Sequence, residues 1–248
     1  MKRYLPLLVL LLLARGAPVF AQEVPSAQPF ALVELFTSEG YSSCPPADDL
    51  LGVIAFEARQ KGQRIYPLAF HVDYWDDLGW PDPFSDRAFS RRQHTYAQVF
   101  DPSRVYTPQM IVNGTDAFVG ADRERARKSI RTALSRPAPV AVALRSVTWG
   151  ADSLTVEYEV SGAPSGALLH IALVERGLVT RVPRGENAGR TLRHENVVRA
   201  FETVPGGGRG RVALRPPASV VRANASVVGY VQDPGRMTVL GAASAEIR

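Results

Sequence analysis

Cysteine is almost absent from this chain: Cys44 is the single cysteine among 248 residues. One cysteine cannot close a disulfide within its own chain, so a scaffold held together by internal disulfides is excluded. The thiol is then a buried structural group, a partner for another molecule's thiol, or a reactive group in its own right.

Long apolar runs are also scarce, and the stretch from Leu5 to Ala14 is the longest of them. It is shorter than the roughly 20 residues that a membrane-spanning helix needs. It follows Lys2 and Arg3 and precedes Val19-Phe20-Ala21, an order typical of a secretory signal peptide. We therefore predict a signal peptide over residues 1–21 and a periplasmic or secreted bacterial protein with no membrane span after cleavage.

A large excess of charge of one sign is missing as well. The chain has 29 Lys and Arg against 24 Asp and Glu, and Lys2, Arg3 and Arg15 belong to the predicted signal peptide. The 26 basic residues that remain nearly balance the 24 acids, which leaves a net charge of +2. So small an excess gives no reason to expect a nucleic-acid partner.

Strand-like and helix-like runs alternate in the first half, from residue 29 to 136. This pattern predicts an α/β domain with a mixed sheet. Asn113-Gly114 lies between two short strands and is a strong hairpin signal. The expected elements are strands at 31–36, 65–72, 110–112 and 117–119, and helices at 47–61, 84–99 and 122–135.

The second half, from residue 137 to 248, has a different pattern. About seven strand-like segments alternate with turns rich in Gly and Pro, which predicts an all-β, sandwich-like domain. Arg136-Pro137-Ala138-Pro139 is the natural linker between the two halves. The expected strands are 140–148, 154–160, 168–175, 196–203, 211–214, 226–232 and 238–243.

The single cysteine lies between the first predicted strand and the first predicted helix. Unpaired backbone N–H groups at a helix start favour a thiolate, whereas Asp48 and Asp49 in the first turn oppose it. Ser42 or Ser43 is the expected helix cap, and Pro45 suits the first turn because it has no N–H to leave unpaired. This corner is the candidate site, and a purely structural role for the cysteine stays open.

Three segments carry a resemblance to a known family: Leu35 to Asp48, His71 to Asp76, and Tyr106-Thr107-Pro108-Gln109. They are similar to a secreted thioredoxin-like family known as domain of unknown function 1223. Its members carry Leu-Phe-Thr-Ser-x-Gly-Cys-Ser-Ser-Cys-Pro-Pro-Ala-Asp near their start. Leu78-Gly79-Trp80 and the stretch from Gly185 to Arg199 match too. The resemblance implies an α/β thioredoxin-like domain followed by a sandwich-like domain, and it brings no settled activity.

Tyr41 stands where the family pattern has its first cysteine. By that resemblance, position 41 would hold the attacking thiol and Cys44 the buried resolving thiol, so an internal dithiol cycle is excluded. Cys44 can still form a mixed disulfide, a sulfenic acid or an adduct. We therefore predict a single-thiol redox protein with Cys44 as its catalytic residue. The first alternative is a non-catalytic module that binds a peptide or small molecule.

Thr107-Pro108 completes the site that the resemblance implies. The thioredoxin plan implies a cis peptide bond there, with Thr107 beside the loop that ends at Cys44. Backbone groups of Thr107 would then pair with an extended peptide or protein thiol partner at a surface formed by Tyr41 and Pro108. The residues expected to shape the site are Tyr41, Ser42, Ser43, Pro45, His71, Asp73, Tyr74, Trp75, Trp80, Thr107, Pro108 and Gln109.

Residues 71–80 gather three aromatic residues and three acids around one histidine. A metal site would use His71 and Asp73, which point the same way along a strand, with Asp76 or Asp77 and the cysteine close by. The spacing matches no known ligand pattern, so metal handling is the second alternative and no metal or cofactor is assigned. In the preferred interpretation His71 and Asp73 hydrogen-bond the loops around the thiol.

One long polar stretch remains, from Arg184 to Arg199. It contains Asn187, Arg190, His194 and Glu195. It either leans back over the first half or forms an ordinary surface loop, and the surface loop is the preferred interpretation.

Overall fold

The computed structural model describes residues 28–101, 103 and 105–247 of this chain. The predicted signal peptide lies outside these residues. Within them, no helix is long and apolar enough to cross a membrane.

Two parallel strands lie at the centre of the first half, β1 (Ala31–Thr37) and β2 (Ile65–His71). All seven residues of β1 are buried, as are six of the seven in β2. Strands buried on both faces are expected to be continuously apolar rather than alternating, and β1 has that pattern except at Glu34 and at its last residue, Thr37. Parallel strands cannot be joined by a tight turn, so the connection runs through a helix, α1 (Pro45–Lys61).

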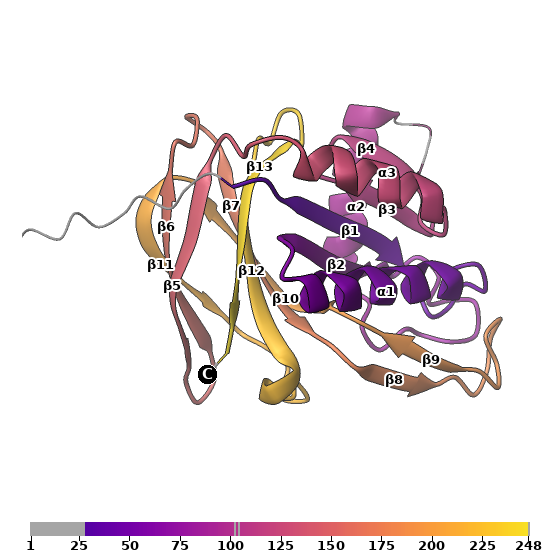
Figure 1. The fold of residues 1–248 in the computed structure, drawn as a ribbon. Helices are drawn as coiled ribbons and strands as arrows, with labels where there is room; N and C mark the ends of the chain where they lie inside the picture. The colour runs from indigo at the N-terminus through magenta and orange to yellow at the C-terminus, as the bar shows by residue number, and fades with distance from the viewer. Residues whose placement is uncertain (1–27, 102, 104, 248) are drawn as a thin grey trace, which may run out of the picture.

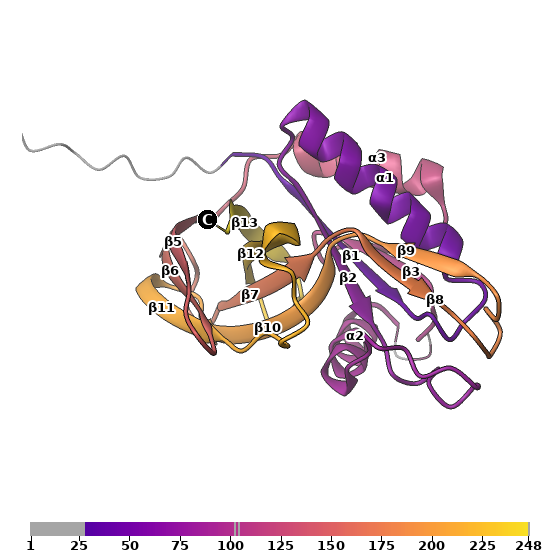
Figure 2. The same ribbon diagram turned by 90° about the horizontal axis from the view of Figure 1, so that it is seen from below.

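Three helices cover the two faces of this part of the sheet. Apolar residues of α1 and α3 (Arg123–Leu134) pack with Val33 and Leu35 on one face. Those of α2 (Arg87–Phe100) pack with Phe36 on the other face. Figure 2 shows α1 and α3 together on one side of the sheet and α2 on the opposite side.

An eight-stranded mixed sheet runs through the whole molecule. Its strand order is β13-β12-β7-β10-β2-β1-β3-β4, so strands from both halves of the sequence are joined between β10 and β2 (Figure 1). The remaining strands of this sheet are β3 (Gln109–Val112), β4 (Asp116–Val119), β7 (Leu168–Glu175), β10 (Val197–Pro205), β12 (Ala225–Gln232) and β13 (Val239–Glu246).

Two smaller sheets complete the structure, with a short 3-10 helix, η1 (Arg222–Asn224), before β12. The three-stranded sheet packs its apolar side chains against β7 and β12. The two-stranded sheet is a hairpin that extends along the α1 side of the molecule (Figure 1). The three-stranded sheet contains β5 (Ala141–Trp149), β6 (Leu154–Ser161) and β11 (Gly208–Leu214), and the hairpin contains β8 (Leu178–Arg181) and β9 (Thr191–His194).

The predicted fold class, a thioredoxin-like α/β domain followed by a sandwich-like domain, is wrong. The structure is mostly sheet, 40% strand against 21% helix, and its main sheet does not stop at the predicted linker. Val197 of β10 pairs with Ala69 of β2, and one core cluster contains Phe70 together with Val198 and Tyr230. Strand pairing of this kind is set by contacts between distant residues, which local periodicity does not report.

Several local predictions are confirmed or corrected by the same structure. Asn113 and Gly114 both have positive φ, 48° and 65°, in the turn between β3 and β4, as the hairpin signal predicts. The expected cap at Ser42 or Ser43 is wrong, because α1 has Cys44 at its N-cap position without a side-chain cap hydrogen bond. Prolines at the first helical positions reduce the number of N–H groups that need a cap.

Candidate metal centre

The corner between β1 and α1 holds the single cysteine in the interior. Cys44 has 0% exposed surface, and burial, followed by the charge of Asp48, raises the pKa of its thiol to about 12. Hydrogen bonds with Thr37, the Ser38 backbone and Thr107 work in the opposite direction without restoring the ordinary value. Cys44 is therefore a protonated, enclosed thiol at neutral pH.

Asp48 lies one helical turn after Cys44 and is also buried, with 6% of its surface exposed. Its Oδ2 accepts a hydrogen bond of 3.1 Å from Thr37 Oγ1, while its Oδ1 is buried without a hydrogen-bond partner. Burial raises the pKa of this carboxyl to about 7, against the opposing effects of His194 and Thr37. The sequence indicates only that Asp48 opposes a thiolate at the helix start, yet one of its oxygens is buried without a hydrogen-bond partner.

His71 is the last residue of β2 and is fully buried. Its Nδ1 lies 2.7 Å from Asp82 Oδ2, and its Nε2 is buried without a partner. Burial favours a raised pKa for Asp82, but His71 and the backbone N–H groups of Glu39 and Phe84 outweigh it and hold that pKa below its usual value. An ionised carboxylate only accepts, so Nδ1 carries the proton, and in the neutral ring Nε2 presents a lone pair.

His194 is the last residue of β9 and is 2% exposed. Its Nε2 lies 2.8 Å from Glu39 Oε1, while its Nδ1 is buried without a partner. The other oxygen of Glu39 accepts a hydrogen bond of 2.8 Å from Trp80 Nε1, which fixes the carboxylate. In a neutral ring that bonds a carboxylate through Nε2, Nε2 carries the proton and Nδ1 presents the lone pair.

These three side chains converge on one point. Asp48, His71 and His194 each offer a ligand atom, and these atoms lie within 4.8 Å of one another. The two imidazole rings are 5.0 Å apart at their centroids. Among the described residues, five buried side-chain atoms lack a hydrogen-bond partner, and three of them are Asp48 Oδ1, His71 Nε2 and His194 Nδ1. We call these three residues the Asp48–His71–His194 cluster.

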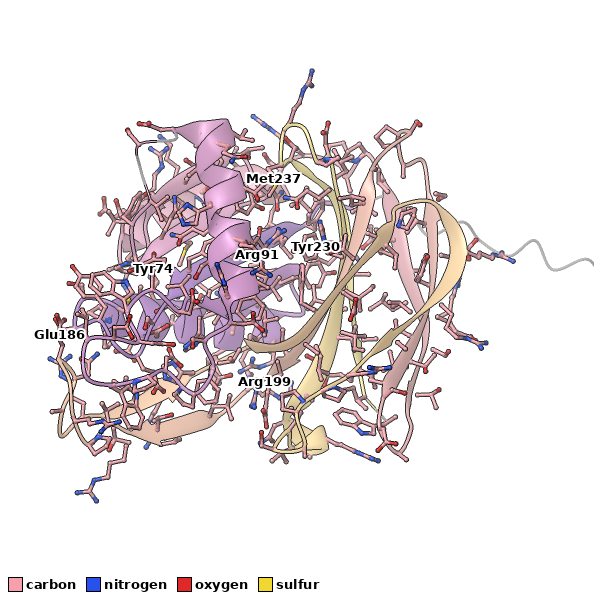
Figure 3. The ribbon with its side chains drawn as sticks, turned by 180° about the vertical axis from the view of Figure 1, so that it is seen from behind. Tyr74, Arg91, Glu186, Arg199, Tyr230 and Met237 are labelled. Carbon is pink, nitrogen blue, oxygen red and sulfur yellow. The ribbon has the colours of Figure 1, made fainter. Side chains whose placement is uncertain are left out.

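The tip of the β8–β9 hairpin is hydrogen-bonded to the loop between β1 and α1. Asn187, which is 1% exposed, donates hydrogen bonds of 2.8 Å and 3.2 Å to the carbonyl groups of Glu39 and Tyr41. Glu186 accepts one of 2.9 Å from the backbone N–H of Ser42, and Figure 3 shows Glu186 at the outer end of the hairpin. The preferred interpretation of residues 184–199 as an ordinary surface loop is therefore wrong.

Of the expected site-shaping residues, His71 belongs to this cluster, whereas Tyr41, Trp75 and Thr107 contact one another outside it. The rings of Tyr41 and Trp75 are stacked, with centroids 4.0 Å apart and planes at 1°. Trp75 Nε1 donates to Thr107 Oγ1 at 2.7 Å, and the Thr107–Pro108 peptide bond is cis, as expected. A side chain at Gly40 would have its Cβ 2.8 Å from the carbonyl oxygen of Trp75, so only glycine permits this approach.

The other residues of the expected site have structural partners. Tyr74 and Gln109 both hydrogen-bond Gln93, on α2. Ser90 Oγ donates a short hydrogen bond to the carboxylate of Asp73 and accepts one from the backbone N–H of Asp73. Pro45 begins α1, while Ser42 and Ser43 are exposed and Pro108 is buried.

Asp73, Asp76 and Asp77 do not join His71 in the cluster. Asp76 instead accepts hydrogen bonds from the Asp82 N–H and from Ser85 Oγ. Sequence reasoning missed Asp48 and His194 as members of the cluster, and Asp82 and Glu39 as the hydrogen-bond partners of His71 and His194. The sequence did contain a usable signal. Thr191–His194 alternates exposed and buried positions, so His194 falls on a buried position, where an imidazole needs a hydrogen-bond partner.

Comparisons with known proteins give a family and a fold. A family model described as Protein of unknown function (DUF1223) matches residues 32–232. The crystal structure of a protein from Agrobacterium tumefaciens is 28% identical, with a TM-score of 0.61, over 88% of this chain and 94% of that one. It shows that the fold described above is shared over most of the chain.

Two further structures are only remotely similar. A domain of the outer membrane lipoprotein Omp28 from Porphyromonas gingivalis is 14% identical over 45% of this chain and 89% of that one, with a TM-score of 0.27. A β-glucosidase from Kluyveromyces marxianus is 10% identical over 45% of this chain and 14% of that one, with a TM-score of 0.21. Structural similarity at these two TM-scores carries no functional argument. No curated protein matches the chain.

Proposed function

This chain belongs to the DUF1223 family, whose description assigns no activity, and we propose that it is a metal-binding protein that holds one divalent transition metal ion in the Asp48–His71–His194 cluster. The observation that carries the proposal is the convergence of three buried, unpartnered donor atoms. A buried polar atom without a partner costs about 1–3 kcal/mol, so three of them at one point call for a ligand. A cation placed between them would satisfy all three.

The donor set favours zinc or a neighbouring transition metal over magnesium or calcium. Two imidazole nitrogens and one carboxylate oxygen suit Zn²⁺, Co²⁺, Ni²⁺ and Cu²⁺, whereas Mg²⁺ and Ca²⁺ prefer oxygen ligands alone. The hydrogen bonds from His71 to Asp82 and from His194 to Glu39 also support this assignment. Such carboxylate–imidazole pairs orient a metal-binding ring and raise its basicity.

Thiol chemistry has weaker support in the same site. A single-thiol redox protein needs an accessible thiolate, whereas Cys44 is fully buried and the pKa of its thiol is raised to about 12. Capture of a peptide at the Tyr41 and Pro108 surface has weaker support too, because Pro108 is buried and Tyr41 already stacks on Trp75. Export of the chain remains a prediction from residues 1–21.

Isothermal titration of the untagged, metal-free chain with ZnCl₂ tests the proposal. We expect one zinc ion per chain for the wild type, and an affinity at least about 100-fold weaker in His194→Ala because one of three ligands is lost. His94→Ala is the matched control, since His94 is exposed and lies on α2 away from the cluster. Equal binding by the wild type and His194→Ala, or no binding by either, would overturn the proposal.

A further inference from the structure

The Asp48–His71–His194 cluster is one ligand short of a closed tetrahedral site. Among the described residues, no fourth His, Cys, Asp or Glu places a ligand atom with the three that lie within 4.8 Å of one another. Cys44 is near Asp48, as the effect of Asp48 on its pKa indicates, but it does not belong to the group. Zinc sites with three protein ligands leave the fourth position to water or to an exogenous ligand.

A cavity on the side of the β8–β9 hairpin adjoins two members of this cluster, Asp48 and His194, whose donor atoms lie buried behind its wall. Its volume is about 300 Å³, and Asp48 and His194 form part of its wall. A water molecule takes about 30 Å³ of liquid volume, so the cavity is large enough for a small molecule or ion. Its lining residues are Pro45, Asp48, Asp49, Arg190, Thr191, Leu192, Arg193 and His194.

The charges around the cavity favour an anion once a metal is bound. Arg190 and Arg193 face one lining acid besides the ligand Asp48, namely Asp49. A divalent ion with one carboxylate and two neutral imidazoles keeps a net positive charge among its own ligands, and the carboxylates of Asp82 and Glu39 behind the two rings offset it. Arg190 and Arg193 supply the positive charge on the cavity side. Arg190 Nη1 donates a 3.0 Å hydrogen bond to Asn187 Oδ1, which anchors this guanidinium at the hairpin and leaves it further N–H donors.

We propose that the fourth coordination position takes a small oxyanion, a carboxylate or a phosphate, which enters through this cavity and contacts Arg190. The inference rests on the proposed function, because the anion binds to the metal ion. Binding exchanges a metal-bound water for an anion oxygen, and no covalent bond of the protein changes. The site is thereby a metal-dependent receptor for small oxyanions and not merely a structural cross-link.

Visible absorption of the Co²⁺-loaded full chain tests this inference, because the cobalt spectrum reports changes in its ligands. Acetate and inorganic phosphate are added in separate titrations. We expect a saturable spectral change with at least one of them, and an anion affinity about tenfold weaker in Arg190→Gln, since one charge-assisted hydrogen bond is lost. Arg181→Gln is the matched control, because Arg181 is exposed on β8 and does not line the cavity.

The outcomes separate the two proposals. Tight Co²⁺ binding with a spectrum that neither anion changes would overturn the oxyanion inference and leave metal binding intact. Equal anion affinities in the wild type and Arg190→Gln would overturn the route through the cavity. Failure of the wild-type chain to bind Co²⁺ would overturn metal binding itself.

Discussion

At the residue scale, the candidate site depends on hydrogen bonds that fix which nitrogen of each histidine is free. Asp82 holds His71 through Nδ1, whereas Glu39 holds His194 through Nε2. The nitrogen left without a hydrogen-bond partner therefore differs between the two rings, Nε2 in His71 and Nδ1 in His194. Each supporting carboxylate is buried and bonded to further groups, so neither ring is free to turn away.

Glu39→Gln tests the role of this support. The amide removes the carboxylate that fixes the ring of His194, so we expect zinc affinity to fall by about 10- to 100-fold. Competition with a chromophoric chelator measures the change. Glu57→Gln is the control, because Glu57 is an exposed residue of α1 that bonds Lys61. An unchanged affinity in Glu39→Gln would show that the carboxylate does not act on the metal.

The state of the single thiol gives a second prediction at this scale. Because the thiol of Cys44 is fully buried and its pKa is raised to about 12, we expect negligible alkylation of the folded chain at pH 8. Alkylation after unfolding in guanidinium chloride should be fast, as for a free cysteine with a pKa of about 8.5. Rapid labelling of the folded chain would contradict the enclosed thiol and favour the single-thiol hypothesis.

At the element scale, the cluster joins three pieces of secondary structure that are far apart in the sequence. Asp48 comes from α1, His71 from the end of β2 and His194 from the end of β9. In the described part of the chain β9 pairs only with β8, and a two-stranded hairpin alone is marginally stable in water. The bonds of Asn187 and Glu186 hold the hairpin tip, and a metal ion would add a link at its base.

Hydrogen exchange therefore gives a prediction for the hairpin. Saturating zinc at about 100 times its dissociation constant should slow exchange of the β8 and β9 amides that open locally, by up to about 100-fold. The amides of β12 and β13 are the internal control, because these strands lie in the main sheet away from the cluster. The effect should vanish in His194→Ala. Equal slowing of amide exchange in β8–β9 and in β12–β13, or slowing in neither pair of strands, would contradict a metal link at β9.

Elements with strong local signals were predictable from the sequence, and their partners were not. The apolar run of β1 and the Asn113-Gly114 turn predict their structures because neighbouring residues alone determine them. The cis peptide at Pro108 followed from a resemblance. The pairing of β10 with β2, and the approach of His194 to Asp48, depend on residues more than a hundred positions apart. No local pattern contains that information.

At the scale of the whole molecule, the core continues across the predicted linker. Arg92 on α2 forms a 2.7 Å ion pair with Glu34 of β1 and a 3.1 Å hydrogen bond with Gln232 of β12. Its guanidinium lies over the rings of Phe70, Tyr96, Phe201 and Tyr230, from both halves of the sequence. Figure 3 shows Tyr230 beside α2, at this junction.

This continuity predicts that the two halves unfold together. Urea unfolding followed by tryptophan fluorescence should give the same midpoint as far-UV circular dichroism, since three tryptophans are shared between the halves. Arg92→Ala should lower the free energy of unfolding by about 3–5 kcal/mol, because it leaves the buried carboxylate of Glu34 without its cation. Two separate transitions in the wild type would show that the halves are independent.

The most direct measurement of metal binding is anomalous X-ray diffraction at the zinc absorption edge, from a crystal of the chain grown with one equivalent of zinc. We predict one strong anomalous peak, about 2.0–2.1 Å from His71 Nε2 and His194 Nδ1 and about 2.0–2.2 Å from an oxygen of Asp48. No peak at the cluster, or a peak only at the exposed His94, would contradict the central claim.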